Sequence, residues 1–122
     1  MPYALILSVL AALPGFEVAQ GWDFQDADAA TAWHANAYLT DVGHRDGALH
    51  ARAIDWDPFF TCSTVNVEAT ASQCVLLRMK ADVSGGGQLF WTSQTAGQHG
   101  GFDGAKVTDF NVRASDEWQD IY

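Results

Sequence analysis

Residues 75–92 read VLLRMKADVSGGGQLFWT. Two runs of alternating polarity stand on either side of a glycine-rich segment, residues 84–87. Side chains of a strand point alternately to opposite faces, so one face of each run is apolar. The pattern predicts two antiparallel strands joined by a glycine turn, with the apolar faces toward a core. The expected core residues are Val75, Leu77, Met79, Leu89 and Trp91.

The opposite faces of these two runs carry Arg78, Gln88 and Phe90. Antiparallel pairing would join the three side chains into one patch on the sheet. A guanidinium and an amide can bond to hydroxyl groups, and a flat ring can cover the C–H face of a sugar. The patch is therefore a candidate carbohydrate-binding face. The alternative is an ordinary solvated face of an antiparallel sheet.

The rest of the chain also consists of short strand-like runs separated by turn residues. Short runs rich in Val, Phe, Trp and Tyr recur at intervals of roughly 8–12 residues, which is typical of a sandwich or barrel. Asp46-Gly47 predicts a hairpin turn, residues 98–104 predict a loop, and residues 26–32 are a short helical candidate. We therefore expect an all-β fold, an antiparallel β-sandwich. The expected strands lie near residues 22–24, 33–40, 47–53, 58–65, 74–82, 87–92, 105–112 and 117–122.

Length and charge limit the possible functions. The chain has 122 residues, which is the size of one domain, and a formal net charge of −9. A negative field of this size repels phosphate backbones and anionic lipid headgroups. Nucleic acid and membrane surfaces are therefore not expected as partners.

The first segment predicts export. Residues 4–13 are an apolar run of the length that a secretory signal peptide needs, and shorter than a membrane-spanning helix. We expect a signal peptide over residues 1–20 and a mature domain over residues 21–122, secreted, periplasmic or at the cell surface. The alternatives are an atypical start and a buried N-terminal strand.

The last segment alternates in polarity up to Tyr122 and contains no turn signal. The chain thus ends within an expected strand, and we expect the domain to lack its last strand or strands. Cys62 and Cys74 are compatible with a disulfide in an exported protein, and buried thiols are the alternative.

Asp55-Trp56-Asp57 is the sharpest local constellation. On a strand its two carboxylates would point to one side about 6–7 Å apart, within the range that glycosidases use. Such carboxylates need an apolar pocket to raise the pKa of the acid, and Asp-x-Asp before Pro58 is more typical of a solvated turn. No motif for a catalytic triad, a nucleotide site or a metal site occurs. We therefore expect no enzyme activity, no catalytic residues and no metal site.

Trp56 and His34 are further candidates for contact with a ligand. An exposed Trp56 could stack on a sugar ring, and a ring folded onto the edge of the sandwich is the alternative. His34 faces away from Trp33 and is the one histidine expected near a binding face. Trp33 and Trp118 lie in apolar strand patterns and are expected in the core.

The order of these motifs resembles bacterial jelly-roll domains of the galactose-binding-like, carbohydrate-binding-module type. The resemblance covers residues 21 to 122 and lies in order and spacing rather than in any single motif. The motifs are Trp22-Asp23-Phe24, Ala32-Trp33, Gly47-Ala48-Leu49, Asp57-Pro58-Phe59-Phe60, Leu77-Arg78-Met79-Lys80, Gln88-Leu89-Phe90-Trp91-Thr92 and Glu117-Trp118-Gln119-Asp120-Ile121-Tyr122.

The resemblance implies a two-sheet jelly roll that binds a glycan without catalysis, attached to a catalytic or anchoring domain. Such domains continue beyond the strand that contains Trp118 and Tyr122, and this sequence stops there. Some carry a structural calcium near their termini, for which Asp23 and Asp26 would be the oxygen ligands; exposed turn carboxylates are the alternative. A different class of function, a structural or protein-interaction sandwich within a larger exported protein, is the main rival.

Overall fold

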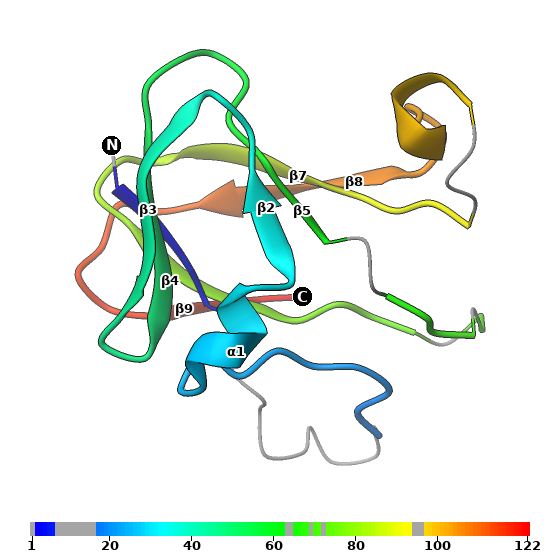
Figure 1. The fold of residues 1–122 in the computed structure, drawn as a ribbon, viewed down its shortest axis with the longest axis horizontal. Helices are drawn as coiled ribbons and strands as arrows, with labels where there is room; N and C mark the ends of the chain where they lie inside the picture. Colours follow the sequence, from blue (N-terminus) through cyan, green and yellow to red (C-terminus); the bar gives the residue numbers. More distant parts are fainter. Residues whose placement is uncertain (1, 7–16, 63–64, 69, 72, 94–96) are drawn as a thin grey trace.

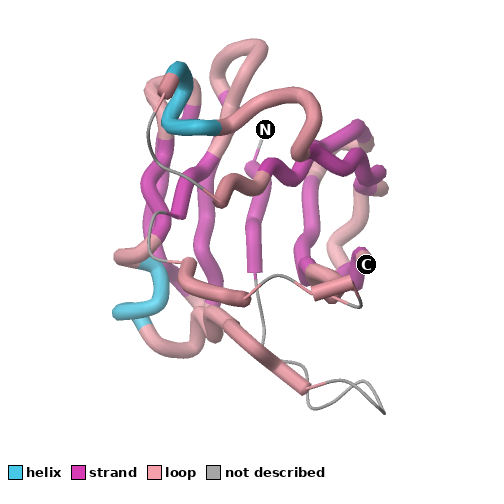
Figure 2. Tube along the Cα trace, turned by 90° about the vertical axis from the view of Figure 1, so that its right-hand side faces the viewer, coloured by secondary structure: helices cyan, strands magenta, loops and turns pink. Residues whose placement is uncertain are grey.

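The computed structural model describes residues 2–6, 17–62, 65–68, 70–71, 73–93 and 97–122. These residues form mainly short strands with very little helix, so the all-β expectation is confirmed (Figure 1). The helix α1 (Ala27–Ala30) and the 3-10 turn η1 (Gln98–Gly101) lie outside the strands (Figure 2). The strands are β1 (Pro2–Ile6), β2 (Trp33–Ala35), β3 (Leu39–Arg45), β4 (Ala48–Ala53), β5 (Phe60–Cys62), β6 (Leu77–Ala81), β7 (Gly85–Phe90), β8 (Val107–Val112) and β9 (Gln119–Ile121).

The largest sheet has five strands in the order β3-β4-β1-β6-β9, and every neighbouring pair is antiparallel. Two smaller antiparallel pairs, β2–β5 and β7–β8, complete the described strands. Most strands that the sequence predicts are present, and most of these are shorter than expected. The expected strand over residues 33–40 is divided between β2 and β3. No described helix is long and apolar enough to cross a membrane.

Strand β1 lies in the middle of the large sheet, between β4 and β6. Leu5 is the register partner of Leu49 on one side and of Met79 on the other. An N-terminal strand was the alternative to a signal peptide for this segment. Residues 7–16 lie outside the described part of the chain, and the signal peptide stays a prediction.

The hairpin of β3 and β4 has the turn that the sequence predicts. Asp46 and Gly47 both have positive φ, 52° and 71°, as a two-residue turn of this kind requires. Helix α1 is also where a helix was expected. Its N-cap is Asp26, whose side chain accepts a hydrogen bond from the backbone N–H of Asp28.

The predicted pairing of β6 with β7 is wrong. Both edges of β6 are already occupied, by β1 and β9, and β7 pairs with β8 instead. The glycines expected in the turn are part of β7 itself. One of them, Gly87, lies so close to the ring of Phe110 on β8 that a Cβ there would collide with it.

The core lies between the large sheet, strand β8, the β2–β5 pair and the segment that includes Trp22 and Phe24. Phe24 is completely buried, although residues 22–24 form no strand. The buried core residues are Phe24, Ala48, Leu49, Ala51, Leu77, Met79, Ala81 and Val112, and Trp22, Trp33, Phe60, Phe110 and Ile121 pack against them.

The core expectations for β6 and β7 are confirmed only in part. Leu77 and Met79 are buried, and Leu89 is half-buried. Val75 precedes β6 and is exposed, and Trp91 follows the end of β7 and is 49% exposed. Trp118, also expected in the core, is exposed and lies under the ammonium of Lys80. Alternation is thus correct for the residues that lie within paired strands and fails at their ends.

Candidate functional site

The most exposed large aromatic side chain in the described part of the chain is Trp56, at 82%. It lies in the loop of residues 54–59, between β4 and β5, at the top of Figure 1. Two neighbours in this loop, Ile54 and Phe59, are also exposed. Exposed apolar side chains gathered in one place are typical of an interaction site.

Asn36, just after β2, holds this loop in place. Its Nδ2 donates to the backbone carbonyl of Asp57 (2.8 Å), and its Oδ1 accepts from the backbone N–H groups of Tyr38 and Phe59 (both 3.2 Å). The backbone adds two hydrogen bonds, from Asn36 N–H to the Phe59 carbonyl (3.1 Å) and from Ile54 N–H to the Tyr38 carbonyl (2.9 Å). The loop is therefore tied at both ends while its middle stands in solvent.

Trp56 has an aromatic neighbour across this junction. The ring centroids of Trp56 and Tyr38 are 6.2 Å apart, and the ring planes are inclined by 42°. Tyr38 is half-buried, whereas Trp56 is almost fully open to solvent. We call these two residues the Tyr38–Trp56 pair. Two inclined rings present a shallow aromatic surface, which suits stacking with a flat apolar face of a ligand.

Asp55 and Asp57 flank Trp56, and both are exposed. They lie in an irregular loop, so the strand geometry assumed for a catalytic pair is absent. Oδ1 of Asp55 accepts from the backbone N–H of Trp56 at 2.8 Å, which is a local turn contact. The hydrolase interpretation therefore loses its geometric basis.

The Arg78, Gln88 and Phe90 patch is not assembled by strand pairing, because β6 and β7 belong to different sheets. Nε and Nη2 of Arg78 donate to the two carboxylate oxygens of Asp120 on β9, at 2.8 and 3.1 Å. This contact lowers the pKa of the Asp120 carboxyl and raises the pKa of the Arg78 guanidinium. Arg78 therefore serves an ion pair across the sheet.

Gln88 also bonds to a carboxylate on a neighbouring strand, within the β7–β8 pair. Its Nε2 donates to Oδ1 of Asp109, its register partner, at 2.9 Å. Phe90, at the end of β7, is exposed. Their role in ligand binding stays a prediction.

His34 is exposed on β2, two residues before Asn36. Its backbone carbonyl accepts a hydrogen bond from Oγ1 of Thr61 on β5, and its ring stays a predicted ligand contact.

The two carboxylates considered for calcium have local partners. Oδ1 of Asp23 accepts from the backbone N–H of Gln25, and Oδ1 of Asp26 caps α1. Among the described residues, no three His, Cys, Asp or Glu side chains are grouped so as to hold a metal ion. Cys62 and Cys74 are not joined by a disulfide.

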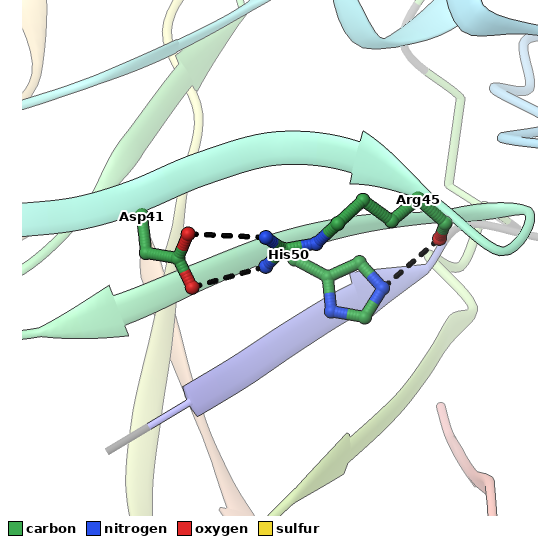
Figure 3. A network of polar contacts seen from close by, with 3 residues as sticks. All are labelled: Asp41, Arg45 and His50. Atoms are coloured by element: carbon green, nitrogen blue, oxygen red, sulfur yellow. Dashed lines mark hydrogen bonds and ion pairs between the residues drawn. The ribbon is translucent and has the colours of Figure 1, made fainter.

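A polar network on the β3–β4 hairpin is the other concentration of charge (Figure 3). Arg45 donates to both carboxylate oxygens of Asp41, at 3.0 and 3.1 Å, and the Arg45 carbonyl accepts from Nε2 of His50 at 2.9 Å. The Arg45 guanidinium lowers the pKa of the Asp41 carboxyl. The network lies where the register of the two strands shifts, between Thr40 and Gly43, and its members are occupied with one another.

Trp56 is thus the sequence-predicted site residue that is 82% exposed and has a neighbouring ring. Sequence reasoning missed Asn36 and Tyr38, which fell inside one expected strand over residues 33–40. An available signal was Asn36 itself, because Asn is depleted in strands and enriched where side chains bond to nearby backbone groups. Comparisons with protein-family models, with curated proteins and with solved structures found no match.

Proposed function

We propose that this protein is a non-catalytic carbohydrate-binding module that binds glycan through the Tyr38–Trp56 pair. The observation that carries the proposal is the position of Trp56, which is 82% exposed in a loop held at both ends. Asn36 holds the loop after Trp56, and the hydrogen bond from Ile54 N–H to the Tyr38 carbonyl holds it before Trp56. Leaving an indole ring in water forgoes about 1.5–3 kcal/mol of burial free energy. A ring held in this way is suited to cover the C–H face of a sugar.

The proposal includes the architecture and the setting that the sequence predicts. The large sheet and the two smaller pairs would be the parts of an antiparallel sandwich of the jelly-roll type, similar to galactose-binding-like domains. The module would act outside the cell with β1 retained as the middle strand of its large sheet, and would attach a linked catalytic or anchoring domain to a polysaccharide. Arg78 is not needed for this site, since Asp120 occupies its guanidinium.

The test is calorimetric titration of the refolded chain with a panel of soluble glycans, comparing the intact protein with Trp56→Ala. We expect millimolar or tighter binding of at least one glycan and a loss of about tenfold in affinity for the variant. The matched control is Trp91→Ala, because Trp91 is exposed but lies at the end of β7. No heat from any glycan, or equal loss in both variants, would contradict the proposal.

A structural or protein-interaction sandwich is the second candidate. It is favoured by Ile54, which is 60% exposed beside Trp56 and adds aliphatic surface that a sugar does not require. The variant Ile54→Ser separates the two candidates. Glycan affinity should be unchanged if the Tyr38–Trp56 pair is a sugar platform, whereas docking to a protein would weaken.

A further inference from the structure

We infer that the Tyr38–Trp56 pair selects sugars that carry an ammonium group, such as polymers of glucosamine with free amines, over neutral and over acidic sugars. This inference rests on the proposed function and specifies its substrate class. It depends on the charges around the aromatic surface, which the stacking argument does not use.

The loop surrounds the exposed indole with negative charge. Asp55 and Asp57 precede and follow Trp56, and both are exposed. Among the described residues, ion pairs join Arg45 to Asp41 and Arg78 to Asp120, and no cation pairs with either carboxylate of the loop. The field of the whole chain, with a net charge of −9, has the same sign. A uronic acid approaching Trp56 would therefore be repelled.

The two rings add attraction for a cation. An ammonium within about 6 Å of an aromatic centroid is attracted by the negative face of the ring. The centroids of Tyr38 and Trp56 are 6.2 Å apart, so one cationic group can lie within that range of both rings. The protein itself has a contact of this kind elsewhere, where the ammonium of Lys80 lies 4.8 Å from the centroid of the Trp118 ring.

The geometry assigns separate roles to the parts of the loop. The indole face would take the C–H face of a pyranose, and the ammonium on the sugar would lie toward Asp55 or Asp57. The carboxylates are exposed, so their contribution is screened by salt and concerns choice between sugars more than total affinity. Binding should weaken as salt rises and as the sugar amine loses its proton at alkaline pH.

The test titrates the full chain with three probes of equal length at low salt: a glucosamine oligomer with free amines, its N-acetylated form, and a galacturonate oligomer. We expect the first to bind at least about fivefold more tightly than the second, and the third not to bind. The double variant Asp55→Asn/Asp57→Asn should lose this preference and retain binding of the N-acetylated oligomer within about twofold.

The matched control is Asp28→Asn/Asp46→Asn, which changes the net charge by the same amount. Asp28 is in α1 and Asp46 in the β3–β4 turn, both at the bottom of Figure 1, whereas the loop of Trp56 is at the top. This control should keep the preference. Circular dichroism and thermal unfolding of each variant check that the fold is intact.

The outcomes separate the two claims. If none of the three probes nor any other glycan binds, the proposed function fails. If the N-acetylated oligomer binds as tightly as the free amine, or the two double variants lose the preference equally, the charge selection fails while glycan binding stands. Loss of the preference only in Asp55→Asn/Asp57→Asn, together with loss of binding in Trp56→Ala, supports both.

Discussion

Strands β6 and β7 have similar alternation of polar and apolar residues in the sequence, yet β6 is largely buried and β7 is largely exposed. β6 has β1 on one edge and β9 on the other, and its residues Leu77, Met79 and Ala81 are buried. β7 pairs only with β8 among the described strands, and most of its residues are exposed. The comparison teaches that alternation defines a strand, whereas the elements packed around it decide whether its apolar face becomes core.

The largest expected effect concerns strand β1, which closes the gap between β4 and β6. A chain beginning at Gly21 would leave one edge of each strand with unpaired backbone groups, which costs stability and favours aggregation. We expect loss of cooperative thermal unfolding, measured by circular dichroism, and higher oligomers by light scattering.

The matched variant for this prediction is Ala4→Pro, which removes one amide hydrogen from the middle of β1 in a chain of full length. It should lower the melting temperature in the same direction. If both proteins unfold like the intact chain, β1 contributes nothing to the sheet, and the signal-peptide interpretation of residues 1–20 gains.

The core behind the large sheet should depend strongly on Phe24. Its side chain is fully buried among Leu49, Leu77 and their neighbours, so Phe24→Ala should cost about 3–5 kcal/mol of unfolding free energy. Phe59→Ala is the control, since Phe59 is exposed, and should cost less than about 1 kcal/mol. Urea denaturation measures both, and equal costs would contradict the assignment of Phe24 to the core.

The loop that displays Trp56 should depend on Asn36. Asn36→Ala removes three hydrogen bonds made by the side chain and should cost about 1–3 kcal/mol. We also expect weaker glycan binding, because the loop loses its fixed position. Asn66→Ala, at an exposed position, is the control and should change neither denaturation nor binding. Unchanged binding in a destabilised Asn36→Ala protein would show that display of Trp56 does not need this anchor.

The β7–β8 pair has its own packing requirement at Gly87. Gly87→Ala would force the Phe110 ring to move and should cost about 1–3 kcal/mol. The control is Gly85→Ala, where the added methyl group meets no atom within 4 Å. Both variants restrict the backbone in the same way, so the difference between them measures the cost of displacing the Phe110 ring. Equal melting temperatures of the two variants would contradict the close contact.

The smallest effect is the pH dependence of the Arg78–Asp120 pair. The folded-state pKa of Asp120 is lowered by Arg78, so the pair stabilises the fold above the unfolded pKa of about 3.9 and this stabilisation is lost as pH falls through the folded pKa. Because both side chains are partly exposed, the contribution is less than about 1 kcal/mol. Asp120→Asn should be less stable than the intact chain at pH 7, and the difference should shrink as the pH falls below about 3.9. A difference that stays constant with pH would contradict this prediction.

Local sequence signals predicted turns and strand faces well, and predicted poorly which strands pair with one another. The Asp46-Gly47 turn and the buried residues Leu77 and Met79 of β6 follow from turn-residue preference and from period two, which are properties of short segments. β4 departs from period two, since Ala48 and Leu49 are consecutive and both are buried. The pairing of β7 with β8, and of β1 with both β4 and β6, joins segments far apart in the chain, and nothing local encodes it.

The candidate site shows the same division. Trp56 was predicted from its own residue type and its acidic neighbours. Tyr38 and the anchor Asn36 come from a different segment, so their contact with the loop of Trp56 required knowledge of how β2 and β5 pair. The strand pairing expected to assemble the Arg78 patch was wrong for the same reason, because β6 pairs with β9, where Asp120 contacts Arg78.

The strand order of the large sheet also sets the order in which the molecule can fold. β1 precedes both of its partners, β4 and β6, by more than 40 residues along the chain, and β9 joins β6 only near residue 121. Contacts between such distant segments make folding slow, because long loops must close, at a cost in entropy, before strand pairing can stabilise the chain. The nascent chain therefore carries open strand edges until β9 has been made, and a binding protein that shields extended segments should raise the yield of folded molecules.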